Sequence, residues 1–428
     1  MKIPRSSLAI MIILLGVLSA LQRIKLGGVQ IEDVPLLFLL AFCSAKALCS
    51  GGSIHLSRTV SEIFRSYCLL LLAIVVLSIL AFRLPFYPLS DLPVYKQPLL
   101  LSLSRILQFA AILCGFFWFT NALLRNRDLL VQALSAYYWT GIASSIYAIL
   151  SQIATVIFHL EPGAFSPLGV SYIGEDLRAR GLFNEGGPFG IYLLSVLVVG
   201  LLRRRLTGKR LGIANIAVIM IAFLLSASKA GFLAGCLLCF YSIVSAASFR
   251  KKVAYFFLFA VLLSGAAAWL DIWTQLLGYK DSYDTLEQTV AAPGIDPDLS
   301  TGRVGALYIT PRMIAAHPIT GIGFGNYPAI RNDPHYLGSL PPVDVEDLPA
   351  LGIIGLAAEI GVPMTLWLLI LLFTPYWIMR KRGSLIALAL LFQPVAHIFA
   401  VQVTFFYPWF VSGCAIAAAS SATGSPSK

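Results

Sequence analysis

One stretch of the chain decides its fold class. Residues 211–248 read LGIANIAVIMIAFLLSASKAGFLAGCLLCFYSIVSAAS, and Lys229 is the only charged residue among them. A helix that crosses a bilayer needs about 20 apolar residues. The stretch is therefore long enough for two such helices, and the polar residues Ser226–Lys229 divide it. We expect two spanning helices that meet at this turn.

The composition of the whole chain agrees with this stretch. Of its 428 residues, 58% are hydrophobic and 12% are charged, and the mean hydropathy is +0.83. A soluble domain carries roughly 25% charged residues, so a bilayer has to supply the missing apolar solvent. We predict an all-α polytopic membrane protein with a single integral membrane domain, residues 1–428, and about twelve transmembrane helices.

The predicted spans are the apolar runs of sufficient length. They are residues 7–24, 34–50, 66–83, 101–123, 130–159, 186–202, 211–227, 229–248, 253–270, 351–379, 384–401 and 405–421. The N-terminal run resembles a signal peptide, but no convincing small-residue cleavage site follows it. We interpret it as the first span.

Basic clusters give the expected orientation. The formal net charge is +11, and clusters such as Arg203–Arg205, Arg250–Lys252 and Arg380–Arg382 lie between apolar runs. Cytoplasmic loops of membrane proteins are enriched in Lys and Arg. The clusters therefore predict cytoplasmic N- and C-termini, and their position beside spans argues against nucleic acid as a partner.

With this orientation, two long loops lie on the outer side, at residues 160–185 and 271–350. The second loop holds ten of the twenty acidic residues and has a helical pattern near 303–316. Connections of this length are usually functional or disordered. We expect the loop 271–350 to be partly folded and to cap the membrane domain.

Two arginines come just before the span that begins near residue 186. Arg178 and Arg180 are followed by a turn-forming sequence, Asn-Glu-Gly-Gly-Pro, at 184–188. A guanidinium presents a fixed fork of donors that matches phosphate oxygens. The alternative is an interface anchor that reaches toward lipid headgroups. The Gly/Pro turn favours a functional role.

Lys229 lies in the turn between two predicted spans, on the outer side. A lysine there departs from the positive-inside pattern. An anion contact and a favourable position at a helix terminus both explain it, and the sequence does not choose between them.

A glycine-rich segment, HPITGIGFGNY, occupies residues 317–327 and follows Arg303 and Arg312. Its glycine spacing suggests a dinucleotide-binding fingerprint, but no strand and helix frame it. We expect the glycines to allow a close approach of the backbone to a ligand or a neighbouring helix.

Acidic residues follow this segment. Asp344, Glu346 and Asp347 lie before an apolar run, and Glu359 lies inside that run. A carboxylate within a span is costly and marks a functional or a paired position. Both explanations of Glu359 stay open.

Together, these motifs resemble the O-antigen ligase and Wzy-type polymerase superfamily. The best-matching part of the chain is about 170–370. The segments that carry the resemblance are RGLFNEGGPF at 180–189, LLSASKAG at 224–231, Gly302-Arg303, HPITGIGFGNY at 317–327 and LGIIGLAAEIG at 351–361.

The resemblance implies the substrates and several site residues. Such proteins transfer a glycan from an undecaprenyl-diphosphate-linked donor to a glycan acceptor without a metal or another cofactor. Arg180 and Arg303 are then expected to face the donor diphosphate, and Arg178 is a further candidate. Lys229 stands where the family often has arginine. Arg312 and Gly323 show an Arg-x10-Gly spacing that is similar to a polymerase feature.

The sequence departs from the ligases at one point. Ligases resembling this chain carry a histidine shortly before the last glycine-rich segment, but residues 343–349 read VDVEDLP. A general base is still needed for the acceptor hydroxyl. The candidates are Asp347 first, then His335 and Glu359. The missing histidine favours a polymerase.

We therefore expect polymerisation of undecaprenyl-diphosphate-linked oligosaccharide repeats at the periplasmic face of a bacterial inner membrane. Membrane lipids, a flippase and a chain-length regulator are the expected partners. The first alternative is an O-antigen ligase that transfers the glycan to lipid A core. The second is a polysaccharide or lipid transporter, although no internal repeat is present and the notable charges gather on one face. A non-catalytic scaffold is a third alternative.

Overall fold

The structure is a computed structural model, and it is mostly helical. The two hairpins among its described residues are short: β1 (Lys25–Leu26) pairs antiparallel with β2 (Val29–Gln30), and β3 (Val170–Ile173) with β4 (Asp176–Ala179). The described residues are 5–22, 25–26, 29–30, 33–50, 58–81, 97–159, 169–173, 176–245, 252–253, 257, 260, 303–338, 340, 342, 352–399 and 401–421.

Five helices in the described part of the chain are long and apolar enough to cross a membrane. They are Ser61–Ala81 within α3 (Arg58–Ala81), α4 (Pro98–Arg125), α5 (Arg127–Phe158), α6 (Gly186–Thr207) and Val362–Arg382, which joins α17 (Val362–Met379) to η2 (Arg380–Arg382). Shorter apolar helices are Ala9–Leu18 within α1 (Arg5–Leu18), α7 (Ile213–Leu225), α8 (Lys229–Val244) and α18 (Ser384–Ile398).

These helices suit an integral membrane protein, but the predicted number of about twelve spans is not confirmed. The other helices in the described residues are α2 (Asp33–Ser50), α13 (Arg303–Ala316), α14 (Tyr327–Ile330), α15 (Pro334–Leu337), α16 (Gly352–Ile360) and α19 (Phe406–Ser421). The predicted helical stretch near 303–316 is confirmed as α13. Most of the predicted span 253–270 lies outside the described residues.

The chain divides into two compact units. Unit 1 comprises Met1–Ser61, Ala111–Leu263 and Leu372–Lys428. Unit 2 comprises Glu62–Ala110 and Ser264–Leu371. The expectation of a single membrane domain stays a prediction.

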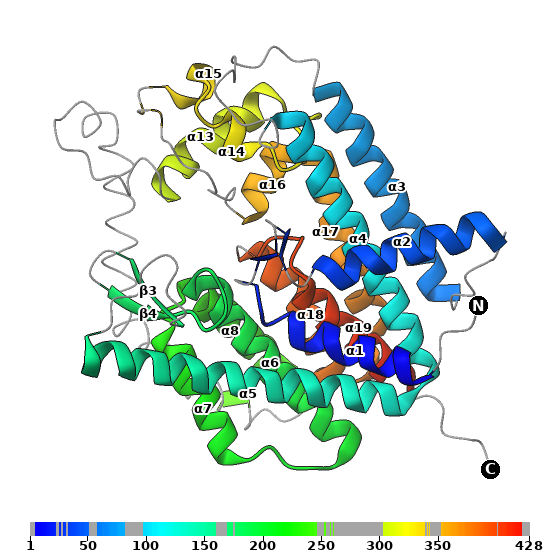
Figure 1. Ribbon diagram of the computed structural model, residues 1–428, viewed down its shortest axis with the longest axis vertical. Coiled ribbons are helices and arrows are strands. Elements are labelled where there is room, and N and C mark those ends of the chain that lie inside the picture. Colours follow the sequence, from blue (N-terminus) through cyan, green and yellow to red (C-terminus); the bar gives the residue numbers. More distant parts are fainter. Residues whose placement is uncertain are drawn as a thin grey trace. The chain divides into compact units, whose positions relative to one another are not determined.

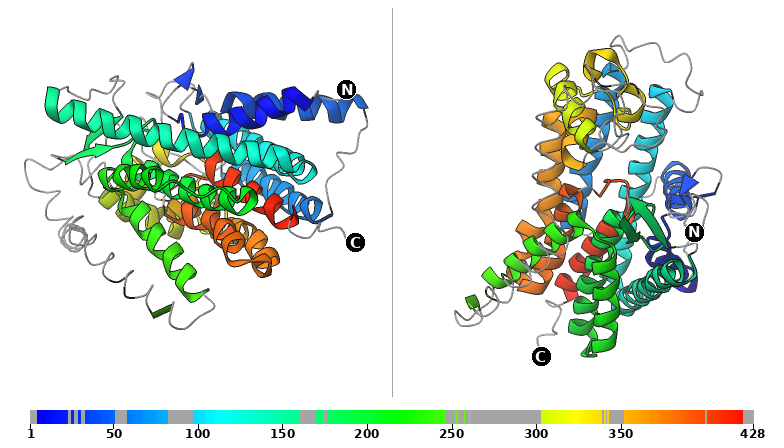
Figure 2. Two further views of the ribbon diagram at one scale, coloured as in Figure 1. Left: turned by 90° about the horizontal axis from the view of Figure 1, so that it is seen from below. Right: turned by 90° about the vertical axis from the view of Figure 1, so that its left-hand side faces the viewer.

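Unit 1 is built around α5 and α6. Asn126 caps α5, because its side chain accepts hydrogen bonds from the backbone N–H groups of Asp128 and Leu129. Helix α1 lies along α5, as Figures 1 and 2 show, while α6 packs against α5, α8, α18 and α19. A Cβ on Gly141 would lie 2.5 Å from a methyl group of Val196, so α5 and α6 approach closely at this glycine.

Aromatic rings fill the centre of unit 1. Tyr137 of α5 stacks on Phe410 of α19 with ring centroids 4.8 Å apart, and Tyr192 of α6 lies 5.4 Å from Tyr137. All three rings are buried. Rings of this size bury large apolar areas, and here they pack α5, α6 and α19 together.

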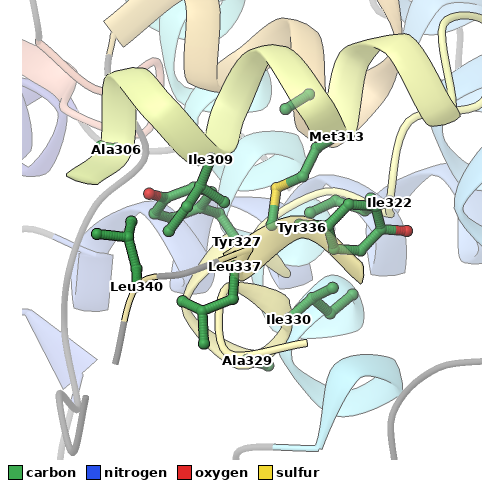
Figure 3. Packing of buried hydrophobic residues seen from close by; sticks show 11 residues of the cluster. Ala306, Ile309, Met313, Ile322, Tyr327, Ala329, Ile330, Tyr336, Leu337 and Leu340 are labelled. Atoms are coloured by element: carbon green, nitrogen blue, oxygen red, sulfur yellow. The ribbon is translucent and has the colours of Figure 1, made fainter. Parts of the chain in front are cut away.

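In unit 2, the short helices α13, α14 and α15 gather at one end of α3, α4 and α16, as Figures 1 and 2 show. Figure 3 shows how they pack: Ile309 and Met313 project from α13 onto Tyr327, Ile330 and residues of α15. These helices lie within the predicted loop 271–350, and its role as a cap of the membrane domain stays a prediction; residues 271–302 and most of 343–351 lie outside the described residues.

One predicted span needs a correction. Residues 351–379 form two helices, α16 and α17, with a break at Gly361, which has φ +81°. Val362 N–H donates to the carbonyl of Pro318 at 2.9 Å. A Cβ on Gly361 would collide with the carbonyl of Ile319. The helix is interrupted because the glycine-rich segment takes up the hydrogen-bonding groups at this point.

Candidate functional site

Arg180 is fixed by the backbone around it. It follows β4, and its N–H donates to the carbonyl of Gly169 at 2.8 Å. Its side chain is only 9% exposed, and Nη1 donates to the carbonyl of Asn184 at 3.4 Å. The next residue, Gly181, has φ +56°, and a Cβ there would lie 2.7 Å from the ring of Phe189. The turn therefore holds Arg180 close to the start of α6.

The N-terminal ends of α6 and α8 meet at Gly186, the first residue of α6. A Cβ on Gly186 would lie 2.6 Å from the carbonyl oxygen of Ser226 and 3.1 Å from that of Ala179. Ser226 belongs to the turn before α8, and Ala179 precedes Arg180. Only a glycine leaves room for these two backbones to approach.

Ser228 joins the same two helix ends. Its hydroxyl donates to the carbonyl of Gly187 at 2.9 Å and accepts from the N–H of Gly231 at 2.9 Å, so it caps α8 while it holds α6. Lys229 follows as the first residue of α8 and is half-buried. Arg180 and Lys229 thus both stand beside the joined helix ends, which we call the cationic turn (residues 178–190 and 226–231).

The cationic turn is suited to an anion. Helix N-termini carry unpaired N–H groups and a partial positive charge. Glu185, the N-cap residue of α6, makes no side-chain capping hydrogen bond. Arg178, half-buried in β4, adds a third cation close in sequence to Arg180. Two helix ends with three basic side chains can bind a phosphate or a diphosphate.

In unit 2, the glycine-rich segment 317–327 forms a loop that we call the glycine loop. Gly321, Gly323 and Gly325 all have positive φ, between +62° and +95°. The N–H groups of Ile322 and Gly323 donate to the carbonyls of Ala358 and Glu359 at 2.9 and 3.0 Å. The loop is thereby attached to the end of α16.

The carboxylate of Glu359 fills the glycine loop. Its Oε1 accepts from the N–H of Tyr327 at 3.3 Å, the N–H of Gly325 also hydrogen-bonds to it, and its side chain is 8% exposed. Concave runs of backbone N–H groups are common anion sites. Here the anion is the protein's own carboxylate, which explains how Glu359 is accommodated beside an apolar helix. The dinucleotide interpretation of these glycines has no support, because their N–H groups are occupied.

Arg105 of α4 lies under the glycine loop. A Cβ on Gly325 would lie 3.0 Å from the Arg105 Cβ, so the loop covers the base of this side chain. Its Nη1 donates to Oε1 of Gln108 at 2.9 Å, and its charge acts on Glu359. Arg105 is partly exposed.

Tyr336 of α15 organises a second cluster of unit 2. Its hydroxyl is 2.7 Å from Nε2 of His317, and its ring lies edge-on to that of His335 at 5.2 Å. Tyr336 is buried, whereas His335 is exposed. Burial, and then the neighbouring His335, lower the pKa of His317, so that its imidazole stays neutral near pH 7.

Arg312 completes this cluster, which we call the Tyr336 cluster (Tyr308, Arg312, His317, His335 and Tyr336). The guanidinium lies 3.6 Å from the centroid of the Tyr308 ring and hydrogen-bonds to its hydroxyl. Its Nη1 also donates to the carbonyl of Tyr336 at 3.4 Å. A cation over an aromatic face is attractive, so Arg312 helps to hold α13 against α15.

Comparison with protein families identifies the segment that contains most of these features. Residues 213–369 match the family model described as O-antigen ligase. This segment is similar to the O-antigen ligase family. The match confirms the resemblance that the motifs indicate, and it supports a function of the O-antigen ligase or polymerase type. Comparison with curated proteins gives no match.

The O-antigen ligase segment includes Lys229, the glycine loop, the Tyr336 cluster and Glu359, whereas Arg178 and Arg180 precede it. The structure brings Arg180 and Lys229 to the same helix ends in unit 1. It brings Arg312 and His335 to Tyr336 in unit 2. Asp347 lies outside the described residues, and only the backbone of Arg303 is described, as the first residue of α13. The functional roles of all these residues stay predictions.

Three further residues of interest were not predicted. His317 and Tyr336 form their hydrogen bond across 19 positions of sequence, and no motif signals such a pair. Arg105 gave a usable signal, because it is a charge inside the predicted span 101–123.

In the described part of the chain, no three His, Cys, Asp or Glu side chains are grouped as metal ligands. Cys236 and Cys239 are free thiols on α8.

Proposed function

We propose that this protein polymerises undecaprenyl-diphosphate-linked oligosaccharide repeats at the periplasmic face of a bacterial inner membrane. The observation that carries the proposal is the cationic turn, where the N-termini of α6 and α8 meet beside Arg180 and Lys229. Together with the O-antigen ligase segment, it supports a site for a lipid-linked diphosphate. Expected partners are the lipid-linked donor and acceptor, membrane lipids, a flippase and a chain-length regulator.

In this mechanism, the cationic turn binds the diphosphate of the donor. When the bond between the anomeric carbon and the diphosphate breaks, negative charge grows on the leaving group. Fixed cations and helix dipoles stabilise such charge without reorganisation. Arg180 is the main group, with Arg178 and Lys229 beside it. For Arg303 and Arg312 the resemblance implies the same role, which stays a prediction.

The acceptor hydroxyl attacks the anomeric carbon as the diphosphate leaves, and its proton passes to a general base. His335 is the described candidate that suits this step best, because it is exposed and contacts Tyr336. Asp347 is the other candidate. Glu359 is less suitable as a base, because its carboxylate is buried and accepts backbone hydrogen bonds. Attack opposite the leaving group inverts the anomeric centre, and the scheme uses no metal ion.

The tyrosines of unit 2 suit the acceptor glycan. Tyr308 and Tyr336 present aromatic rings and hydroxyls beside His335 and Arg312. Side chains with an apolar ring and a polar end suit ligands that are apolar on one face and polar at the edge. We propose that the Tyr336 cluster positions the acceptor sugar.

A ligase is the second candidate function. It would use the same donor site but transfer the glycan once, to lipid A core or to another acceptor. The missing histidine at residues 343–349 favours the polymerase.

Product length separates these functions. Purified full-length protein in nanodiscs is incubated with a labelled lipid-linked repeat, with and without lipid A core. A ladder of products from the repeat alone supports the polymerase. A single transfer that requires lipid A core supports the ligase instead. The same protein is also reconstituted into closed lipid vesicles. Transport of the repeat across the vesicle membrane without any new glycosidic bond would contradict both functions and favour the transporter.

A further inference from the structure

Arg105 is a charged residue inside a helix that is long and apolar enough to cross a membrane. The candidate span α4 runs from Pro98 to Arg125 and is longer than a bilayer requires. Counting about 20 residues back from Arg125, at the end predicted to be cytoplasmic, reaches Arg105. By this count Arg105 lies at the outer boundary of the hydrocarbon, at the depth of lipid phosphates.

A second helix supports the same depth. The span Val362–Arg382 ends in a basic 3-10 turn, and about 20 residues back from Arg380 is Ile360. The charge of Arg105 acts on Glu359, which is next to Ile360. Counting about 20 residues from the basic ends of these two spans therefore reaches Arg105 in one and Ile360, next to Glu359, in the other. Arg105 and Glu359 are close in the structure.

Three residues of unit 2 interact with Arg105 or lie close to it. Gly325 lies over the base of its side chain, so that any larger residue at 325 would collide with Arg105. Gln108 accepts a hydrogen bond from Nη1 at 2.9 Å. The charge of Arg105 also acts on the buried carboxyl group of Glu359. The side chain is still partly exposed.

Glu359 does not require Arg105 as its partner. Two backbone N–H groups of the glycine loop already hydrogen-bond to the carboxylate. Arg312 is the other site candidate among the described arginines of unit 2. Its guanidinium already contacts the Tyr308 ring and the Tyr336 carbonyl. Among the described cations of unit 2, Arg105 is therefore the one best placed to meet a lipid-borne phosphate.

We propose that Arg105 binds the diphosphate of the second lipid-linked substrate, the acceptor. This inference rests on the proposed function, because a polymerase joins two lipid-linked chains and must hold two lipid diphosphates, whereas a ligase holds one. The chemistry recognised is a phosphate or diphosphate group on a lipid at the membrane boundary, which the guanidinium fork matches. In this scheme Arg180 holds the donor and Arg105 the acceptor.

Equilibrium binding of radiolabelled undecaprenyl diphosphate tests the inference. Purified full-length protein in phosphatidylcholine nanodiscs is expected to bind two equivalents. Arg105→Ala is expected to bind one, and Arg180→Ala is also expected to bind one. Arg105→Lys keeps the charge but loses the fork, and we expect it to weaken one of the two equivalents at least about tenfold.

Arg125→Ala is the matched control, since it removes the same charge from the opposite end of the same helix. It is expected to bind two equivalents. If Arg105→Ala does not fold, as judged by size-exclusion chromatography, the Arg105→Lys comparison decides instead, and wild-type binding in that variant would overturn the inference.

The other outcomes are distinguishable. If the wild type binds one equivalent that only Arg180→Ala removes, the role of Arg105 is wrong and the proposed donor site survives. If Arg105→Ala removes an equivalent and Arg180→Ala removes none, the inference survives and the proposed donor site fails. If excess phosphatidylglycerol displaces the Arg105-dependent equivalent, the site binds phospholipid headgroups and the inference is overturned.

Discussion

The cationic turn of unit 1 and the glycine loop of unit 2 use the same device in opposite ways. In both, glycines let a loop approach the end of a helix so closely that a Cβ would collide. In the glycine loop, the carboxylate of Glu359 accepts hydrogen bonds from the backbone N–H groups. In the cationic turn, the N-cap residue Glu185 makes no side-chain capping hydrogen bond, and basic residues gather instead.

The difference teaches what a glycine-rich motif can and cannot indicate. Glycines give backbone access to an anion, but they do not say where the anion comes from. A carboxylate from the protein makes the loop a structural joint. We propose that the arginine and lysine beside the helix ends make the turn a site for an anion from outside.

Removing the main cation of unit 1 should have the largest effect. Arg180→Ala is expected to lower the rate of product formation about 100-fold or more, because one fixed donor to a developing negative charge contributes about 3 kcal/mol. The measurement is the initial rate with a labelled lipid-linked repeat in nanodiscs.

Arg204→Ala is the control, since Arg204 is exposed at the other end of α6. It should keep the wild-type rate. Wild-type chain lengths from Arg180→Ala would contradict the role of the cationic turn.

Removing the side chain of Glu359, which accepts hydrogen bonds within the glycine loop, should destabilise the fold. Glu359→Ala leaves two backbone N–H groups without their acceptor, and each such group costs about 1–3 kcal/mol when buried. Glu359→Gln keeps an oxygen acceptor and should retain most of the stability. Thermal unfolding of the detergent-solubilised protein, followed by circular dichroism, measures both midpoints. Equal midpoints for the two variants would show that the carboxylate does not hold the loop.

A methyl group at the helix junction should separate the ends of α6 and α8. Gly186→Ala places a Cβ against the carbonyl of Ser226, and overpacking of this kind costs about 1–3 kcal/mol. Gly187→Ala is the matched control, because a Cβ at residue 187 meets nothing within 4 Å. Thermal midpoints and undecaprenyl diphosphate binding should both fall for Gly186→Ala alone. A loss of equal size in the two variants would contradict close packing at Gly186.

The smallest expected effect concerns pH and the Tyr336 cluster. The folded state lowers the pKa of His317 from 6.5, chiefly through burial and then through His335. Below pH 6.5 the unfolded chain binds a proton there that the folded chain resists, so stability falls as the pH falls. His317→Gln should reduce this acid-side loss slightly in thermal unfolding curves from pH 8 to pH 5. His159→Asn, a change at an exposed histidine of unit 1, should leave the curve as in the wild type. An unchanged curve in His317→Gln would remove His317 from this role.

The sequence by itself indicated the membrane class, the positions of many helices and the resemblance to the O-antigen ligase family. Apolar runs such as 211–248 must avoid water whatever they pack against, and local motifs were sufficient for the O-antigen ligase resemblance. The candidates Arg180 and Lys229 were also visible, because a cation beside an apolar run is unusual wherever it folds.

Only the tertiary structure decided what the glycines and the single carboxylate do. The break at Gly361, the engagement of Glu359 by the glycine loop and the place of Arg105 beneath Gly325 depend on backbones that meet across tens to hundreds of residues. Side-chain type fixes how a residue partitions between water and lipid, but a hydrogen bond needs a partner at a distance and an angle. That geometry exists only once the chain has folded, so no local pattern could reveal that one glycine-rich turn binds the protein's own carboxyl group while the other joins the ends of two helices.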